Sequence, residues 1–268
     1  MRRPLISVVI PVLNERDRVG TLVGELSHAN SAPFEIIVID GGCNDGTIEA
    51  AQNLDAQAAI TIGVSEPGRG PQFVAGAAQA AGDILWLLHV DSYVAPGALD
   101  RTRAAIAEDG WVGGNFRLIF DGNDRFSTWL SGFYTWFRRR GLYYGDSRIF
   151  VRRDIYDRIG SIQPLALMED YDLTRQMERH GGTCCIDTPA LITSARNFAG
   201  RHPVGIVFGW LKMHTLCGLG VNSQRLAKIY YRRQALSAAN IMSSSDVMNS
   251  TPMRKNKLIR NRAVIADI

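Results

Sequence analysis

The side chains best suited to chemistry in this sequence follow short apolar runs. Asn14 and Glu15 come after the first run, Asp40 comes after the second and Asp91 after the fourth. Carboxylate and amide oxygens accept hydrogen bonds, and carboxylates bind divalent cations such as Mg²⁺. His89 stands two residues before Asp91, on the same side of an extended strand, so the two offer an oxygen and a nitrogen ligand. The alternative is that Asp91 caps the following turn beside an ordinary core His.

Two glycine-containing loops add groups that suit a nucleotide. In the turn from Asp40 to Thr47 the glycines let the backbone approach a bound group, and Asp40 can accept hydrogen bonds from a base or a ribose. An ordinary glycine-rich turn with an Asp cap is the alternative. The loop Glu66–Pro71 is predicted to be flexible and exposed, and its Arg69 could hold a diphosphate together with the N-terminus of the next helix. A solvated Arg in a linker explains this loop equally well.

Three carboxylates stand at the start of a later helical pattern, which Leu167 and Met168 precede. They are Glu169, Asp170 and Asp172. Acidic side chains are favoured at a helix N-terminus by the helix dipole, which explains at least two of them structurally. A carboxylate at a half-buried helix start also suits general-base catalysis, which contributes about 10²–10⁴-fold in rate. Both interpretations stay open on these residues alone.

The elements that must position these side chains alternate between strands and helices in the first ninety residues. Four runs rich in Val, Ile and Leu predict strands buried on both faces: Leu5–Ile10, Phe34–Ile39, Ala59–Gly63 and Ile84–Leu88. Apolar stripes at helical spacing lie between them, at Val19 to Leu26 and at Phe73 to Ala81. This alternation predicts a doubly wound α/β sheet in which the polar groups meet at the carboxyl ends of the strands.

The rest of the chain is predicted to mix helices and strands. Helices are expected over 96–108, 168–180, 203–219 and 223–236, and strands over 111–120, 147–151, 183–186 and 190–195. The aromatic stretch Phe126–Phe137 is predicted to be a core helix. The alternative is that its rings stack on an acceptor sugar or a lipid. Arg138 to Arg140 is predicted to be a solvated face, and residues 243–268 are predicted to be poorly ordered.

The composition excludes collagen-like proteins, disordered chains and small disulfide scaffolds for the bulk of the sequence. At 268 residues, 46% hydrophobic and 21% charged, the chain suits one large globular domain with an appendage. The formal net charge is +4, and from Asn222 onward nine Lys and Arg stand against two Asp. A basic tail on a slightly acidic body is not typical of a nucleic-acid binder and could meet acidic lipid head groups. The four Cys lack metal-site spacing, and we expect neither a secretory signal nor a transmembrane segment.

Taken together, these segments resemble family 2 glycosyltransferases of the GT-A fold over about residues 5 to 235. The residues that carry the resemblance are Ser7–Glu15, Val38–Gly42 with Asn44–Thr47, Gly82–Asp91, and Met168–Asp170 with Leu173. One position departs from the family's usual Asp-x-Asp, because His89 stands where its first Asp is expected. The resemblance implies a mixed, mostly parallel, doubly wound α/β sheet of the GT-A type with C-terminal helices.

The resemblance also implies roles for particular residues. The nucleotide-sugar donor is expected to contact Pro11, Asn14, Glu15, Asp40, Arg69 and Val90. Asp91 is the expected ligand of a Mn²⁺ or Mg²⁺ ion on the diphosphate, and Asp170 the expected catalytic base that deprotonates an acceptor hydroxyl. Acceptor-side or secondary roles fall to Glu169, Gly145, Asp146 and His89.

The predicted function is therefore transfer of a sugar from a nucleoside-diphosphate donor, UDP-linked by preference, to an acceptor hydroxyl with inversion. A nucleotidyltransferase and a non-catalytic nucleotide-sugar binding module are the alternatives. Residues 1–200 are expected to form the catalytic domain, 201–242 a helical extension, and 243–268 a basic tail. The extension either folds back on the domain or lies on the inner face of a membrane and presents a lipid-linked acceptor. We expect a cytoplasmic location and no nucleic-acid partner.

Overall fold

A single mixed sheet organises the protein in the computed structural model. The structure describes residues 3–29, 33–54, 58–122, 124–138, 148–163, 165, 168–194, 202–226 and 228–230. Residues 1–228 form one compact unit, and residues 229–268 form a second. The predicted tail from residue 243 lies outside the described residues, and the predicted division at residue 200 stays a prediction.

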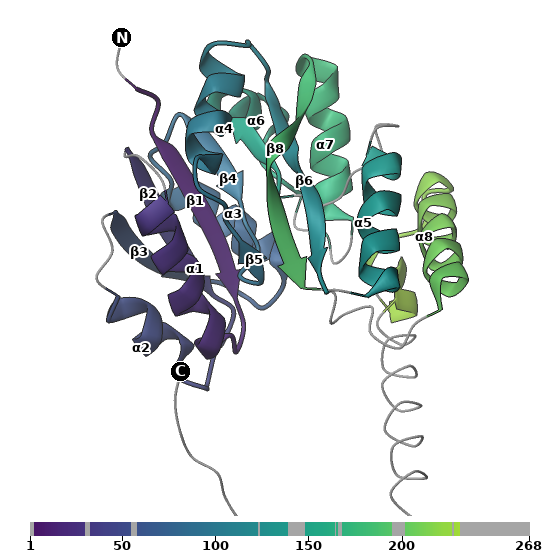
Figure 1. The fold of residues 1–268 in the computed structure, drawn as a ribbon, viewed down its shortest axis with the longest axis horizontal. Helices are drawn as coiled ribbons and strands as arrows, with labels where there is room; N and C mark the ends of the chain where they lie inside the picture. Colours follow the sequence, from purple (N-terminus) through teal and green to yellow (C-terminus); the bar gives the residue numbers. More distant parts are fainter. Residues whose placement is uncertain are drawn as a thin grey trace, which may run out of the picture. The chain divides into compact units, whose positions relative to one another are not determined.

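The sheet has eight strands in the order β3-β2-β1-β4-β7-β6-β8-β5 (Figure 1). Its parallel half consists of β1 (Ile6–Val12), β2 (Phe34–Asp40), β3 (Ala59–Val64) and β4 (Ile84–Leu87). These are the four predicted strands, each within about two residues of its expected ends. In the register Val12 pairs with Asp40 on one side of β1, and Val9 pairs with Leu87 on the other. The carboxyl ends of the three central strands therefore meet, as predicted.

The second half of the sheet is mixed. It consists of β5 (Ser92–Tyr93), β6 (Gly113–Asp121), β7 (Phe150–Arg152) and β8 (Thr183–Ser194). β7 is antiparallel to both β4 and β6, whereas β6 and β8 are parallel. β8 is one continuous strand where the sequence predicts two segments, and a register shift between Phe116 and Leu118 of β6 accommodates its length.

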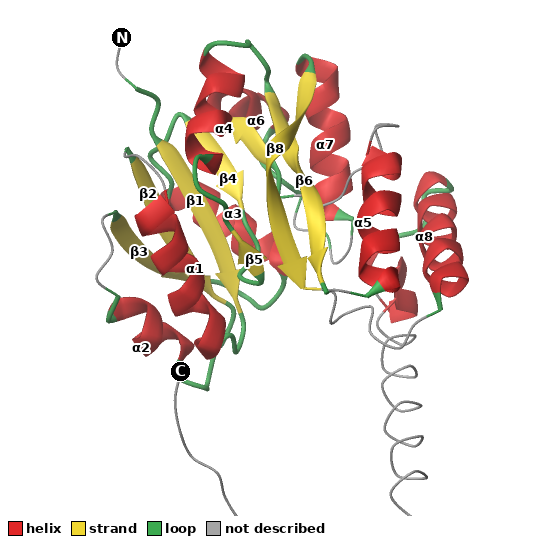
Figure 2. Ribbon diagram, viewed as in Figure 1, coloured by secondary structure: helices red, strands yellow, loops and turns green. Residues whose placement is uncertain are grey.

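Helices cover both faces of the sheet (Figure 2). The core on one face takes side chains from α1 (Arg16–Ala29), α2 (Thr47–Gln52), α4 (Ala98–Ala107), α5 (Arg125–Arg138) and α8 (Pro203–Gly218). The core on the other face takes them from α3 (Arg69–Gln79), α6 (Arg153–Ile159) and α7 (Glu169–His180). Strand residues alternate between the two cores, so each central strand is apolar on both faces. This is the α/β architecture that the sequence predicts.

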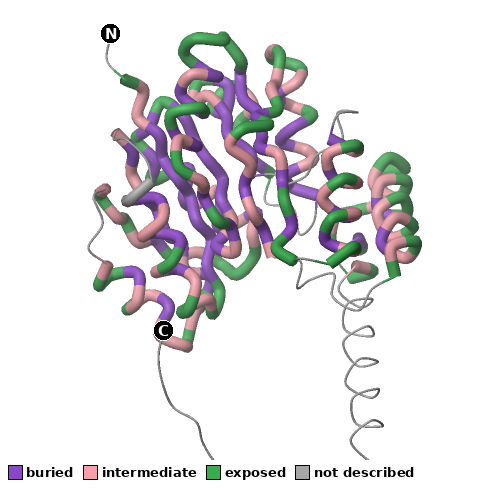
Figure 3. Tube along the Cα trace, in the orientation of Figure 1, coloured by how far each residue is buried: buried purple, intermediate pink, exposed green. Residues whose placement is uncertain are grey.

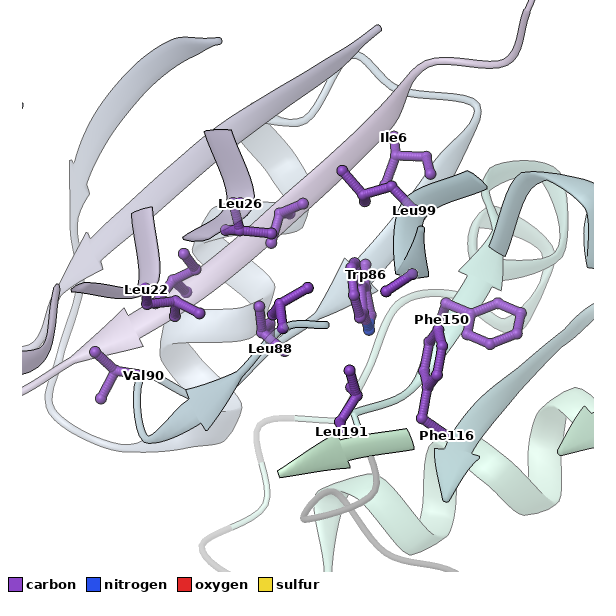
Figure 4. Close-up of a cluster of buried hydrophobic side chains, with 14 of the residues drawn as sticks. Ile6, Leu22, Leu26, Trp86, Leu88, Val90, Leu99, Phe116, Phe150 and Leu191 are labelled. Carbon is purple, nitrogen blue, oxygen red and sulfur yellow. The ribbon is translucent and has the colours of Figure 1, made fainter. Parts of the chain in front are cut away.

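The core lies under these helices and along the middle of the sheet (Figure 3). On the face of α1 it contains Leu22, Leu26 and Trp86, and Trp86 stacks on Phe116 at a centroid distance of 5.3 Å (Figure 4). On the other face α3 approaches β1 closely, because a Cβ at Gly76 would stand 2.2 Å from the Val9 side chain. A glycine there lets the first turn of α3 reach the ends of β1 and β2.

Candidate functional site

The loops after β1 and β2 are tied together by hydrogen bonds. Asn14 adopts a left-handed conformation with φ 54°, and its backbone N–H donates to Cys43 Sγ at 3.2 Å. In return Asn14 Oδ1 accepts from the backbone N–H of Asn44 at 3.0 Å. The backbone N–H of Glu15 donates to Thr47 Oγ1 at 2.9 Å. The two predicted nucleotide segments therefore form one connected edge, and Cys43 and Thr47 are the partners that hold it.

Asp40 lies at the tip of β2 with its carboxylate held by the turn that follows. Asp40 Oδ1 accepts hydrogen bonds from the backbone N–H groups of Gly42 at 2.9 Å and Cys43 at 2.7 Å. Burial by itself would raise the pKa of Asp40, but the hydrogen bonds from Cys43 and Gly42 outweigh it and hold the pKa below its ordinary value. Asp40 is therefore a fixed anion that can accept hydrogen bonds from a ligand.

Gln72 is a residue of this site that the sequence analysis missed. Its side chain is buried, and its Nε2 donates to the carbonyl oxygens of Val12 at 2.9 Å and Ile39 at 2.7 Å. These carbonyls end β1 and β2, so one amide of α3 holds the two strand ends in place. A polar residue inside the apolar stripe of a helix is the signal that could have found it.

Arg69 links α3 to α7. The sequence places Arg69 in a flexible loop, and this expectation is wrong: Arg69 is the first residue of α3, in the turn after Gly68. Its Nε lies 3.1 Å from Glu169 Oε1, and the Glu169 side chain is only 2% exposed whereas that of Arg69 is 35% exposed. The guanidinium therefore reaches the start of α7 while it stays accessible to a ligand.

Asp170 stands next to that ion pair at the start of α7. It is 7% exposed, and its Oδ1 accepts the backbone N–H of Tyr171 at 2.6 Å. Met168 precedes the helix in a left-handed conformation with φ 70° and is itself buried, which turns the chain sharply into α7. The predicted half-buried carboxylate at a helix start is therefore present, and the ion pair with Arg69 places it near the first turn of α3.

Asp91 follows β4 and is paired with an arginine that the sequence analysis did not single out. Arg148 Nη2 lies 3.4 Å from Asp91 Oδ1, and Arg148 Nε donates to Ser92 Oγ at 2.7 Å. The Arg148 side chain is 1% exposed, and its backbone is left-handed with φ 52°. The Trp86 indole N–H donates to its carbonyl oxygen. Arg148 is therefore a fixed cation that holds Asp91 in place.

The residues around Asp91 provide little for a caged metal. His89 contacts Phe73 of α3 edge to face, with ring centroids 5.7 Å apart. Nowhere in the described parts of the chain do three His, Cys, Asp or Glu side chains come together as a possible metal site. Asp91 is the carboxylate that fits a cation whose remaining ligands are diphosphate oxygens and water, a mode that Mg²⁺ commonly uses.

Val90 and Asp91 also border a cavity of about 200 Å³ on the side of α1. Its carboxylates are Glu25, Asp91 and Asp121, and Arg18 lies among them. Burial raises the pKa of Glu25, although the backbone N–H of Val94 donates to its carboxylate. The Val90 side chain belongs to the hydrophobic core, so a donor contact at this position would use its backbone.

The first turn of α3 connects the predicted site residues. Arg69 pairs with Glu169, Gln72 bonds the ends of β1 and β2, and Phe73 contacts His89. Four segments far apart in the sequence thus reach one helical turn, whose N-terminus carries a partial positive charge. Pro11 is buried within β1, one residue before the strand ends. Gly145 and Asp146, predicted for the acceptor side, lie outside the described residues.

Comparison with known protein families gives a match over the first part of the chain. The sequence model described as glycosyl transferase family 2 matches residues 7–161, which is more than half of the chain. Glycosyltransferase AglE of Haloferax volcanii is 24% identical over 242 residues, covering 86% of this chain and 77% of the relative.

Two further relatives match over shorter stretches. An undecaprenyl-phosphate 4-deoxy-4-formamido-L-arabinose transferase of Yersinia enterocolitica is 31% identical over 113 residues, 40% of this chain and 34% of the relative. A dolichol-phosphate mannosyltransferase of Pyrococcus furiosus is 28% identical over 104 residues, 38% of this chain and 30% of the relative. These matches span about a third of the length of each relative.

Solved structures share the fold. A mannosyltransferase from Pyrobaculum calidifontis in complex with GDP-Man and Mn²⁺ superposes with a TM-score of 0.58 at 16% identity, covering 94% of this chain and 77% of that chain. TarS 1–349 from S. aureus in complex with UDP-GlcNAc superposes with a TM-score of 0.57 at 15% identity, covering 70% and 58%. The GT-A type of α/β fold predicted from the sequence is confirmed.

Proposed function

The chain belongs to glycosyl transferase family 2, and on that premise we propose that it transfers a sugar from a nucleoside-diphosphate donor to an acceptor hydroxyl with inversion. The observation that carries the proposal is the connection of four candidate segments to the first turn of α3. Asp40, Asn14 and Glu15 would hold the base and ribose at the ends of β1 and β2. UDP is our first choice of carrier by resemblance to the family, and the structural neighbours support a nucleotide-sugar of either base, since one is described with UDP-GlcNAc and another with GDP-Man.

The charge of the departing diphosphate would be neutralised by this chain's own cations. Arg69 is partly exposed at the N-terminus of α3, where the helix dipole favours an anion. Asp91 is the residue that would hold a divalent cation, and a cation there would supply Lewis-acid neutralisation of the diphosphate. Arg148 pairs with the carboxylate of Asp91 and bonds Ser92, so it would hold that carboxylate in a fixed orientation toward the diphosphate.

Asp170 would act as the base. Its carboxylate removes the proton of the acceptor hydroxyl as that oxygen attacks the anomeric carbon, and the bond to the diphosphate breaks on the opposite side. A single displacement of this kind inverts the anomeric configuration. Glu169 positions Arg69 through the ion pair at Nε and stands directly before Asp170, so it would connect the donor side to the base.

A donor screen tests the proposal. The protein is incubated with UDP-, GDP- and dTDP-sugars and Mn²⁺, and both thermal shift and release of the nucleoside diphosphate are scored. A separate incubation contains nucleoside triphosphates, a sugar phosphate and Mn²⁺, and release of pyrophosphate is scored. A donor at 100 times its dissociation constant adds roughly 2.7 kcal/mol of stability. Release that depends on the sugar nucleotide supports a transferase. Stabilisation without release supports the binding module, and release of pyrophosphate from a nucleoside triphosphate supports a nucleotidyltransferase.

We further propose that the acceptor is lipid-linked and that α8 lies on a membrane surface. α8 packs on α5, where Trp210 stacks on Phe133 at 5.2 Å, so the helix does fold back on the body. Its outer face is nevertheless apolar, with Val204 54%, Phe208 65% and Leu211 59% exposed. No helix among the described residues has both the length and the apolar composition needed to cross a bilayer.

The distribution of charged residues around α8 also supports a membrane surface. The sequence contains no Asp or Glu between Asp187 and Asp246, while Lys212, Arg225 and Lys228 are exposed within or just after α8. An apolar stripe beside basic side chains suits the surface of an anionic bilayer. Two of the relatives are named for undecaprenyl-phosphate and dolichol-phosphate acceptors, which adds support for a lipid-linked acceptor.

A further inference from the structure

Asp91, the residue proposed to hold a cation, is already neutralised by a buried arginine. Arg148 comes just before β7, which pairs antiparallel with β4, so it lies beside the end of the strand that leads to Asp91. Its Nη2 lies 3.4 Å from Asp91 Oδ1, and its side chain is 1% exposed whereas that of Asp91 is 18% exposed. The two formal charges cancel, and the carboxylate is the accessible member of the pair.

Three features fix Arg148 in its place. Its Nε donates to Ser92 Oγ at 2.7 Å, its carbonyl oxygen accepts the Trp86 indole N–H at 3.3 Å, and its backbone is left-handed with φ 52°. A guanidinium this buried is costly unless a negative group compensates it. Asp91 therefore cannot give up its partner as freely as a carboxylate in a surface ion pair can.

The segment that ends at Asp91 also carries less negative charge than an Asp-x-Asp pattern would. His89 stands at the position of the first Asp, and a histidine adds no negative charge. With Asp91 compensated by Arg148, these three side chains have no net negative charge, where two aspartates would carry two. A cation on the Asp91 carboxylate would lie within about 8 Å of the guanidinium, a distance over which salt screens the repulsion only partly.

We propose that Arg148 sets the affinity of this site for a divalent cation, so that the cation binds together with the donor diphosphate and only weakly before it. The diphosphate carries the negative charge that the protein lacks here, and a cation between the diphosphate and Asp91 is attracted to both. Arg69, accessible at the start of α3, would hold the diphosphate from the other side. This inference rests on the proposed function, because it concerns the donor and the cation of that reaction.

The neighbouring cavity contains other carboxylates that could bind a free cation. Glu25 and Asp121 border this cavity together with Asp91 and Arg18. Glu25 accepts a hydrogen bond from the backbone N–H of Val94 at 3.1 Å, which leaves part of its carboxylate engaged within the protein. Any affinity of the protein for a cation must therefore be traced to Asp91 by substitution of Asp91 itself.

Two measurements on the unaltered protein test the order of binding. Water-proton relaxation measures the affinity for Mn²⁺ without nucleotide, and titration calorimetry measures UDP and GDP binding in EDTA and again in Mn²⁺. We expect weak binding of Mn²⁺ alone, and we expect Mn²⁺ to tighten nucleotide binding at least tenfold. Linkage then requires that the nucleotide tightens Mn²⁺ binding by the same factor. Nucleotide affinity that is equal with and without Mn²⁺ would overturn the proposal.

Variants of Arg148 test whether its charge is the cause. Arg148→Met removes the charge and keeps most of the volume, so Mn²⁺ alone should bind about tenfold more tightly than it does to the parent. Arg148→Lys keeps the charge and should bind Mn²⁺ like the parent. If Arg148→Met lowers Tm, Arg148→Gln repeats the measurement with an N–H donor kept for Ser92. Unchanged Mn²⁺ affinity in the variants without the charge would overturn the proposal.

Two further variants locate the effect. Asp91→Asn combined with Arg148→Met should lose the gain in Mn²⁺ affinity, and a gain that survives would place the cation on another carboxylate and overturn the proposal. Arg152→Met is the matched control, because Arg152 also belongs to an Arg–Asp pair at β7 but its partner is Asp154. The side chains of that pair are 36% and 45% exposed, so its loss should leave Mn²⁺ affinity unchanged.

Failure of this proposal can be told from failure of the proposed function. If UDP or GDP binds and Arg148→Met has the Mn²⁺ affinity of the parent, Arg148 does not control the cation and the transferase proposal stands. If neither nucleotide binds while Arg148→Met gains Mn²⁺ affinity through Asp91, the effect of Arg148 on the cation stands. In that case the order of binding and the transferase proposal both fail.

Discussion

The two halves of the sheet satisfy their polar groups differently. At the ends of β1 and β2 the polar groups bond one another: Asp40 accepts from Gly42 and Cys43, and Gln72 donates to two strand-end carbonyls. Along β6 and α5, Arg117 and Arg138 have buried N–H donors that find no acceptor in the described parts of the chain, and Trp136 is 49% exposed. In the first region these polar groups are therefore satisfied within the protein. The second leaves buried donors of two arginines without an acceptor among the described residues.

The largest expected effect comes from Asp170, the residue proposed as the base. Asp170→Asn should reduce kcat by about 10²–10⁴-fold, because it removes the proton acceptor and keeps the shape of the side chain. The measurement is the rate of sugar transfer, with UDP affinity followed in parallel. Affinity should stay close to that of the parent, since the donor contacts lie on other residues.

Asp172→Asn is the matched control for that variant. Asp172 stands two residues further along α7, where its carboxylate accepts from Gln176 Nε2, so its loss should leave transfer nearly unchanged. Turnover by Asp170→Asn equal to that of the parent would remove Asp170 from the mechanism. The ion pair between Arg69 and Glu169 would then have only a structural role.

Polar truncation should then lower stability in the first region more than in the second. Gln72→Leu strands the carbonyls of Val12 and Ile39 in the core, so we expect a loss of about 2–3 kcal/mol in the free energy of unfolding. Urea unfolding measures it. Gln79→Leu, an exposed position of the same helix, should change stability by no more than about 0.5 kcal/mol. Arg138→Met removes buried donors that have no acceptor among the described residues, so it should cost less than Gln72→Leu. Equal losses in the two variants would show that the two regions do not differ.

The features that the sequence predicts are those that depend on neighbouring residues along the chain. The parallel strands and the positions of Asn14, Asp40 and Asp91 at or just after the strand ends were predictable, because each is a local signal of an apolar run followed by a polar residue. Burial at Glu169 and Asp170 also follows the prediction of a half-buried helix start. These features depend on a few neighbouring residues, which a single sequence displays.

The residues that were not predicted depend on tertiary pairing. Gln72 acquires its role only when α3 crosses the ends of β1 and β2, and Arg148 only when β7 brings it beside Asp91. Arg138 lies in a run of three arginines, which by composition indicates solvent, yet packing of α5 against the sheet buries it. No local pattern distinguishes a buried guanidinium from a solvated one, because the difference lies in the partner element.

A moderate effect is expected on metal affinity. His89→Asp restores a second carboxylate near Asp91, so Mn²⁺ should bind about tenfold more tightly in the absence of nucleotide, which corresponds to about 1.4 kcal/mol. Water-proton relaxation of Mn²⁺ measures this without any turnover. His202→Asp, an exposed position before α8, is the control and should leave Mn²⁺ affinity unchanged. Unchanged affinity in His89→Asp would place position 89 away from the cation.

The smallest expected change in stability, and the sharpest test of the acceptor side, is on the outer face of α8. Phe208 is 65% exposed, so Phe208→Asp should alter the free energy of unfolding by no more than about 0.5 kcal/mol. On a membrane surface the same substitution places a charge in the apolar boundary and repels anionic head groups, so sedimentation with phosphatidylglycerol vesicles should fall strongly. Gln79→Asp puts an equal charge on exposed α3 and should sediment like the parent. If Phe208→Asp sediments with the vesicles as fully as the parent, or if the parent binds no vesicles, then α8 does not face a membrane. The exposed apolar stripe of α8 would then be no evidence for an acceptor side.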